Sequence, residues 1–281
     1  MKFKLGCKLN YSVAASSTFI FNLSVVEKKH QIILQESLQI EPSIDYEEYV
    51  SPRMENRYLR VYPPQGDLQV SYQATVDLFY RDEDPSSIPE NPPDKLPLET
   101  LHYLYPSRYC ESDRLMRLAQ NEFGNLIPDY SRVTAICNWI YDNVTYLSGS
   151  TNQHTSAYDT VTERAGVCRD FAHLGIAFCR ALNIPARFVT GYAYNLEPQD
   201  FHAYFEAYLG DRWYLFDPTR LAPCNGLIRI GIGRDAADVA FATIFGDVQM
   251  NYKDVFVEAV PDQDGKTPDL PDYTNRAIAL I

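Results

Sequence analysis

The sequence predicts an α+β protein in which an antiparallel β domain precedes a larger domain that contains helices. Runs of β-branched and aromatic residues dominate the first third of the chain, and a proline-rich stretch follows them. After that stretch the spacing of apolar residues changes from two to about 3.6, the helical period. These three observations predict four regions: a β-rich domain at 1–85, a linker at 86–105, an α-containing domain at 106–260 and a tail at 261–281.

The β-rich region has four short runs typical of strands, separated by turn-forming residues: 18–23, 32–34, 57–62 and 70–76. A small antiparallel sandwich is the expected outcome. The linker is inferred from prolines that block both strand pairing and helix: Pro85, Pro89, Pro92, Pro93 and Pro97.

Beyond the linker, apolar residues at helical spacing predict one short helix near Leu115 and Ala119 and a second from Val133 to Val144. A third helix and several strands are expected between Gly166 and about Val260. The tail is rich in proline and aspartate until its apolar end at 277–281, which we expect to be docked.

The composition excludes several classes of function. The 25 basic and 37 acidic side chains give a formal charge of −12 without a dense basic run, so a nucleic-acid partner is not expected. No apolar run approaches the ~18 residues of a membrane helix, so no membrane partner is expected either. The first six residues begin like a signal peptide, but Lys8 and Asn10 interrupt the apolar run that a signal peptide needs. We therefore expect this segment to be part of the mature structure.

The six cysteines form no C-x-x-C pair and have no histidine at zinc-finger spacing. We therefore expect no metal and no cofactor. A chain of this length can bury its own core without disulfides, so reduced thiols and a cytoplasmic location are expected.

Cys168 is the candidate nucleophile. It follows Gly166-Val167 and opens an amphipathic pattern that must end near Asn183, because Pro185 follows. A cysteine in the first turn of a helix lies next to unpaired N–H groups and the positive end of the helix dipole, which favour the thiolate. Cys179 lies near the other end of the same helix and is assigned to the core.

A β-hairpin supplies the candidate base. Small or apolar residues alternate with more polar ones along 201–209, as in a strand. Gly210-Asp211 then forms a tight turn, and a second strand returns toward Pro218. This turn pairs residues whose numbers sum to 421, which places His202 and Asp217 on one face, one diagonal step apart. Such neighbours lie roughly 7–8 Å apart at the backbone, a gap that an imidazole and a carboxylate can close with a hydrogen bond. A shift of one residue would instead favour Glu206 as the group that orients His202, and the pattern alone leaves both open.

The other histidines are weaker candidates for the base. His173 lies well over one turn from Cys168 and is expected in the core. His154 lies in a polar loop at 148–156 and is kept as a candidate substrate contact. His30 and His102 lie outside the predicted catalytic block.

Taken together, these segments resemble the bacterial transglutaminase-like proteins, some of which are described as cysteine proteases. The resemblance covers about residues 106–260, and the β-rich region resembles the domain that commonly precedes this core in bacterial members. The segments that carry it are Thr155-Ser156-Ala157, Gly166 to Leu174, Ile184 to Arg187, His202 to Glu206, Phe216 to Thr219 and Gly233 to Val239.

The resemblance implies a papain-like core with the triad Cys168, His202 and Asp217, and it favours Asp217 over Glu206. The animal enzymes carry a Gln-Cys-Trp signature where this chain has Val167-Cys168-Arg169, and no Asp-rich calcium loop is present. We therefore expect acyl transfer from peptide or glutamine-type amides through a thioester, chiefly to water. The partner expected is a peptide or protein substrate. Protein crosslinking and a peptide-binding module without catalysis remain the alternatives.

Overall fold

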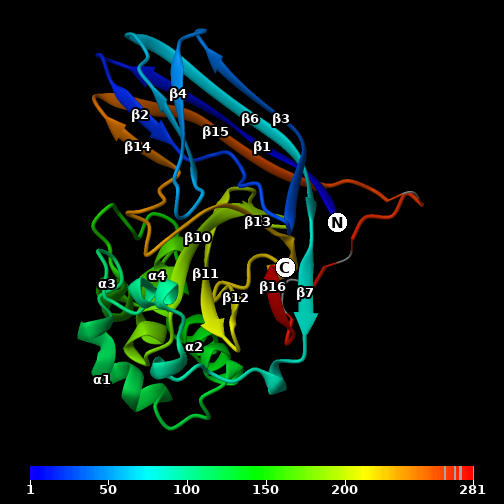
Figure 1. Ribbon diagram of the computed structural model, residues 1–281. Coiled ribbons are helices and arrows are strands. Elements are labelled where there is room, and N and C mark those ends of the chain that lie inside the picture. Colours follow the sequence, from blue (N-terminus) through cyan, green and yellow to red (C-terminus); the bar gives the residue numbers. More distant parts are fainter. Residues whose placement is uncertain (263, 269, 272–273, 281) are drawn as a thin grey trace.

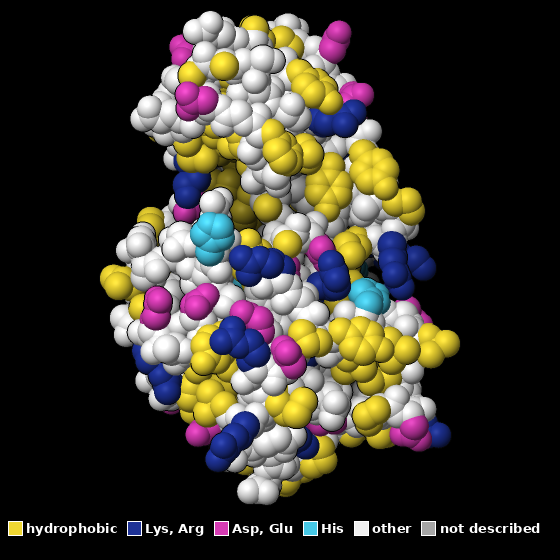
Figure 2. All heavy atoms as spheres, turned by 90° about the vertical axis from the view of Figure 1, so that its left-hand side faces the viewer, with side chains coloured by type: hydrophobic (Ala, Val, Ile, Leu, Met, Phe, Trp, Pro, Cys, Tyr) yellow, Lys and Arg dark blue, Asp and Glu magenta, His cyan; other side chains and the backbone are white. Residues whose placement is uncertain are grey.

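The computed structural model describes residues 1–262, 264–268, 270–271 and 274–280. A β-sandwich forms one part of the molecule, and an antiparallel sheet with helices packed against it forms the other (Figure 1). Figure 2 shows a hollow between the two layers, with hydrophobic side chains on its walls. No helix within these residues is both long and apolar enough to cross a bilayer.

The sandwich confirms the β-rich region predicted from the sequence. Its two four-stranded sheets have the orders β15-β1-β6-β3 and β14-β2-β5-β4. Alternate side chains along β1 and β6 are buried, and Phe3, Leu5 and Val76 belong to the core between the sheets. The strands from the N-terminal region are β1 (Lys2–Val13), β2 (Thr18–Phe21), β3 (Gln31–Glu41), β4 (Tyr46–Val50), β5 (Arg57–Val61) and β6 (Gly66–Leu78).

Two strands of the sandwich come from far along the chain. β14 (Ala242–Phe245) pairs with β2, and β15 (Val248–Ala259) pairs with β1 (Figure 1). The region predicted at 106–260 therefore gives its last two strands to the N-terminal sheets. β1 was not among the predicted strands, although apolar and polar residues alternate along it with the period of a strand.

The antiparallel sheet of the second layer has the order β13-β10-β11-β12-β16-β7. The predicted docked tail contributes its strand β16, which pairs with both β12 and β7; Ile281 lies outside the described residues. The strands are β7 (Tyr80–Glu83), β10 (Ala186–Ala193), β11 (Phe201–Leu209), β12 (Arg212–Phe216), β13 (Leu227–Gly233) and β16 (Ala277–Leu280).

The helices cover one face of this sheet, and α4 is the most buried of them. Gly175 allows α4 to approach β11 closely, because a Cβ at this position would lie 2.5 Å from the Phe205 ring. The helices are α1 (Ser112–Phe123), α2 (Tyr130–Asn143), α3 (Ala157–Glu163) and α4 (Cys168–Ala181), and the two-residue strands β8 (Thr145–Tyr146) and β9 (Ala165–Gly166) pair beside them.

The predicted linker runs through three short 3₁₀ turns, Pro85–Ser87, Pro93–Lys95 and Leu98–Tyr103. It is packed against the second layer rather than free in solvent, since Ile88 and Leu96 are buried.

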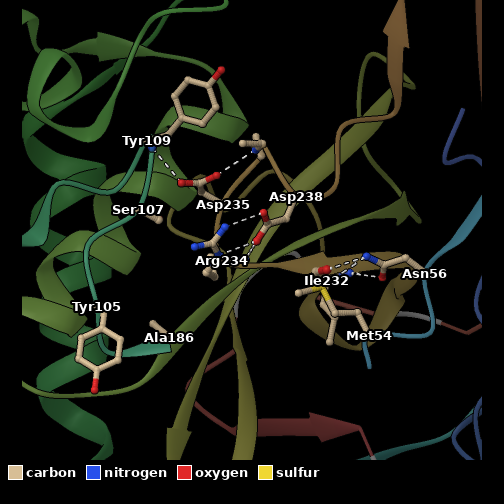
Figure 3. A network of polar contacts seen from close by, with 12 residues as sticks. Met54, Asn56, Tyr105, Ser107, Tyr109, Ala186, Ile232, Arg234, Asp235 and Asp238 are labelled. Carbon is tan, nitrogen blue, oxygen red and sulfur yellow. Dashed lines mark hydrogen bonds and ion pairs between the residues drawn. The ribbon is translucent and has the colours of Figure 1, made fainter. Parts of the chain in front are cut away.

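β13 and the segment after it join the two layers (Figure 3): the Tyr58 hydroxyl in β5 donates to the Asp238 carbonyl at 2.8 Å. The Asp235 carboxylate accepts from the Tyr109 backbone N–H at 2.8 Å, and Arg234 pairs with Asp238 at 2.9 Å. The Asn56 side chain bonds both backbone groups of Ile232, at 2.8 and 2.9 Å, and so joins the sandwich to β13. The motif Gly233 to Val239, which contributed to the family resemblance, therefore has a structural role.

Candidate active site

Cys168 is the first residue of α4, as predicted, and its side chain is half-buried. The Asp170 carboxylate fixes this helix start by accepting from the Val167 backbone N–H at 2.9 Å. A Cβ on Gly166 would lie 2.7 Å from the Asp170 Cβ, so the cap requires glycine there. The thiol is thus held next to the unpaired N–H groups of the first helical turn, which favour negative charge.

The hairpin has the register predicted from its turn. Leu209 pairs with Arg212 and Phe205 pairs with Phe216, so the paired numbers sum to 421. Gly210 and Asp211 both have positive φ, at 50° and 65°, as a tight two-residue turn requires. This register brings His202 Nε2 to 2.7 Å from Asp217 Oδ2.

Burial and the charge of Asp217 shift the pKa of His202 in opposite directions. Burial by itself lowers the pKa of the imidazole, but the charge and hydrogen bond of Asp217, together with the contact with Cys168, raise it to about 10. Because Nε2 is bonded to Asp217, Nδ1 is the nitrogen left for the thiol. The imidazolium form is therefore favoured next to Cys168 at neutral pH.

Asp217 is held in place on its other side. Its Oδ1 accepts from both the backbone N–H and the hydroxyl of Thr219, at 2.9 and 2.7 Å. The carboxylate therefore has a fixed orientation toward His202.

Glu206, the alternative partner for His202, is committed elsewhere. Its carboxylate is fully buried, accepts from Arg187 Nε at 2.6 Å and pairs with Arg229. Burial raises the pKa of Glu206, but the two guanidinium groups outweigh burial and lower it. Glu206 belongs to a buried ion cluster of the sheet and does not contact His202.

Cys179 and His173 are buried in the core, as predicted, and so is Cys137. Burial raises the pKa of Cys137 and of Cys179 well above the ordinary thiol value. His173 is fully buried, accepts from the Ala236 backbone N–H at 3.1 Å and stacks on the Tyr109 ring. Burial lowers the pKa of His173, which keeps it neutral. All six cysteines, each within the described part of the chain, are free thiols.

Two contacts around Cys168 were not predicted from the sequence. Arg169 Nη2 donates to Thr151 Oγ1 at 2.6 Å and so ties the loop at 148–156 to the helix start. His154, the candidate substrate contact, lies exposed in this loop. Tyr146 pairs with Gly166, two residues before Cys168, and burial together with the nearby Cys168 thiol raises the pKa of the Tyr146 phenol. The polar composition of the loop signals exposure, but no local pattern marks Tyr146.

Comparison with known proteins identifies the family. Residues 117–218 match the transglutaminase-like superfamily, and residues 1–91 match the bacterial transglutaminase N-terminal domain. A crystal structure from Cytophaga hutchinsonii, provisionally described as a cysteine protease, is 47% identical. The two align over 100% of this chain and 98% of the other, with a TM-score of 0.94.

The chain belongs to the transglutaminase-like superfamily.

Curated proteins similar to this chain include uncharacterised proteins from two mycobacteria. That from Mycobacterium leprae is 35% identical over 118 residues, or 38% of this chain and 42% of the relative. That from Mycobacterium bovis is 33% identical over 139 residues, or 43% of this chain and 44% of the relative. The match therefore spans less than half the length of these curated relatives.

Proposed function

We propose that this transglutaminase-like protein is a cysteine hydrolase that cleaves peptide or glutamine-type amides through a thioester. The observation that carries the proposal is the placement of Cys168, half-buried at the N-terminus of α4, together with the buried His202 imidazole that Asp217 holds at 2.7 Å and whose pKa Asp217 and the nearby Cys168 raise. Cysteine nucleophiles are activated by such an arrangement of base and orienting group.

In this mechanism the Cys168 thiolate attacks the amide carbonyl carbon and a C–S bond forms. His202, protonated at the start, gives its proton to the leaving amine as the C–N bond breaks. Water then attacks the thioester and loses a proton to His202, the C–S bond breaks, and the free acid leaves. Asp217 keeps the imidazole oriented through both proton transfers.

Water is proposed as the main acyl acceptor. Water is present at about 55 M and amines at millimolar levels or less, so amine transfer must overcome roughly four orders of magnitude, about 5–6 kcal/mol, through acceptor binding. Arg169 is the cation nearest in sequence to the nucleophile, and its guanidinium holds Thr151. We identify no acceptor site for a lysine among the described residues around Cys168.

The test is a peptide library that contains glutamine peptides, incubated with the purified chain with and without a millimolar primary amine. Mass spectrometry should show Cys168-dependent hydrolysis products that exceed amine adducts. Cys168→Ala is the control and should give neither product. An amine adduct that exceeds the hydrolysis product would contradict the hydrolase assignment in favour of transfer. Equal amounts of product from the parent and from Cys168→Ala would exclude an enzyme that uses Cys168 as its nucleophile.

A further inference from the structure

A tight turn just before α1 carries the side chains of Arg108 and Tyr109. Ser107 and Cys110 exchange backbone hydrogen bonds of 3.1 and 3.2 Å, which close the turn with Arg108 and Tyr109 at its tip. Arg180, buried on α4, fixes the base of the turn, since its Nη1 donates to the Ser107 hydroxyl at 2.9 Å. The position of the tip is therefore set by contacts with α4, the helix that begins at the nucleophile.

Contacts fix both the backbone and the side chain of Tyr109. Its backbone N–H donates to the Asp235 carboxylate at 2.8 Å (Figure 3), and its carbonyl accepts from the Ala157 N–H at 2.8 Å. The hydroxyl donates to the Gln153 carbonyl at 2.8 Å. The ring stacks on His173 of α4, with 5.2 Å between the ring centroids and 9° between the planes. Tyr109 is thus a rigid connection between α4 and the loop that contains Gln153.

Two guanidinium groups lie over the Tyr109 ring. The Cζ atom of Arg108 is 4.8 Å from the ring centroid, and that of Arg169 is 5.8 Å from it. Because Arg169 directly follows Cys168, this shared ring places Arg108 close to the start of α4. Arg169 lies near the Asp170 carboxylate, whereas Arg108 is exposed and has no carboxylate partner in the described part of the chain.

The charge beside this turn is opposite in sign to the charge of the whole chain. The formal charge of −12 opposes the approach of an acidic molecule at long range. Figure 2, in contrast, shows Lys, Arg and His side chains gathered along the edge of the hollow between the layers, on the side of the helices. A carboxylate can accept two parallel hydrogen bonds from one guanidinium group, and an arginine held over a fixed ring is already positioned to donate them.

We propose that Arg108 binds a carboxylate of the substrate and makes the site selective for acidic peptides. The proposal rests on the proposed hydrolase function, because the selected peptide is the one whose amide Cys168 attacks. The carboxylate is that of an Asp or Glu side chain near the scissile amide, or that of the C-terminus of a short peptide. Arg169 adds a second positive charge beside Cys168, while its Nη2 holds Thr151.

Two peptide sets that differ only in charge test this role. Every Asp or Glu of the first set is replaced by Asn or Gln in the second, and each peptide is made with a free and with an amidated C-terminus. The parent is compared with Arg108→Gln and with the matched control Arg117→Gln, because Arg117 is also an exposed arginine, on α1. Mass spectrometry of the pooled digests gives the ratio of kcat/KM for the two members of each pair.

The parent should cleave the acidic member of a pair about tenfold faster than its amide twin. Arg108→Gln should bring this ratio to within about twofold of one, and Arg117→Gln should keep it at the parent value. A ratio that persists in amidated peptides assigns the carboxylate to a side chain, whereas a ratio that needs the free C-terminus assigns it to the terminus. Near-ultraviolet circular dichroism should show that both variants are folded.

A parent ratio near one would overturn the proposal. So would a ratio that Arg108→Gln leaves unchanged, including the case in which both members of a pair are cleaved more slowly by the same factor. Failure of the hydrolase function is recognised separately, from retention of the same peptides on immobilised Cys168→Ala with and without Arg108→Gln. Arg108-dependent retention of the acidic set, with no cleavage by the parent, would contradict the hydrolase function and support the carboxylate site.

Discussion

His202 Nε2 and Asp217 Oδ2 lie 2.7 Å apart, with each side chain only 1% exposed. A carboxylate buried this deeply must be paired, and its partner here is the ring that contacts Cys168. The pair therefore favours a protonated His202 imidazole near Cys168 at the start of α4.

Replacing Asp217 with asparagine should remove the charge that favours the imidazolium while keeping the size of the side chain. We expect turnover to fall by about tenfold or more, since the ring loses its orienting partner. Steady-state hydrolysis by the parent and Asp217→Asn gives the comparison, with circular dichroism to confirm the fold. Full activity in this variant would show that Asp217 does not orient the base.

Glu206→Gln should act on stability instead, because Glu206 is buried between Arg187 and Arg229. Leaving two buried guanidinium groups without their anion should lower the free energy of unfolding by about 3 kcal/mol. The control is Glu47→Gln, which breaks an exposed pair with Arg60 and should cost less than about 1 kcal/mol. Equal midpoints in urea for the two variants would contradict this account of Glu206.

The pH dependence of activity should have an alkaline limb set by His202. Its pKa of about 10 lies above the unfolded value of about 6.5, so the ring keeps the proton that the leaving amine needs until the pH approaches 10. Amide hydrolysis should therefore fall above that pH, whereas alkylation by iodoacetamide, which needs no acid, should not. An amide rate that stays level through pH 10.5 would contradict the role of His202 as acid.

The same shift predicts how stability depends on pH. A group whose pKa is raised on folding stabilises the native state fully below its unfolded pKa, and this contribution is lost as pH rises through the folded pKa. The contribution of His202 should thus be complete below about pH 6.5 and decline toward pH 10. Urea unfolding of the parent and His202→Gln should show a stability difference that narrows over this window, and a difference that widens would contradict the sign.

Arg169 should control the mobility of the loop at 148–156, since its guanidinium donates to Thr151. Removing a charge-assisted hydrogen bond of this kind should speed amide hydrogen exchange in the loop by about tenfold in Arg169→Gln. Arg164→Gln is the control, because Arg164 packs over Trp139 and not against the loop. Equal exchange in the two variants would show that Arg169 does not hold the loop.

Local signals in the sequence were sufficient to predict the hairpin and α4. The Gly210-Asp211 turn fixes the pairing of its own strands, and Pro185 limits how far the helix beginning at Cys168 can extend. These two elements place Cys168, His202 and Asp217 together. The catalytic roles of the three residues stay predictions until variants are assayed.

The sequence pattern could not predict which strands far apart in the chain pair with each other. β15 joins β1 across most of the chain, and β16 enters between β12 and β7. The position of Tyr146 beside Gly166 depends on a strand pair of only two residues each, too short to leave a periodic signal. Glu206 could be assigned to the ion cluster only once β10 and β13 had placed two arginines beside it.

The most direct test of the central claim is to look for the acyl group on Cys168. The parent chain is mixed with p-nitrophenyl acetate, quenched with acid within the first turnover, digested and examined by mass spectrometry. We predict an acetyl group on Cys168 that neutral hydroxylamine removes, as expected for a thioester, with His202→Ala forming it more slowly by an order of magnitude or more. A parent chain that carries acetyl groups only on lysines or on other cysteines would contradict the assignment of Cys168 as the nucleophile.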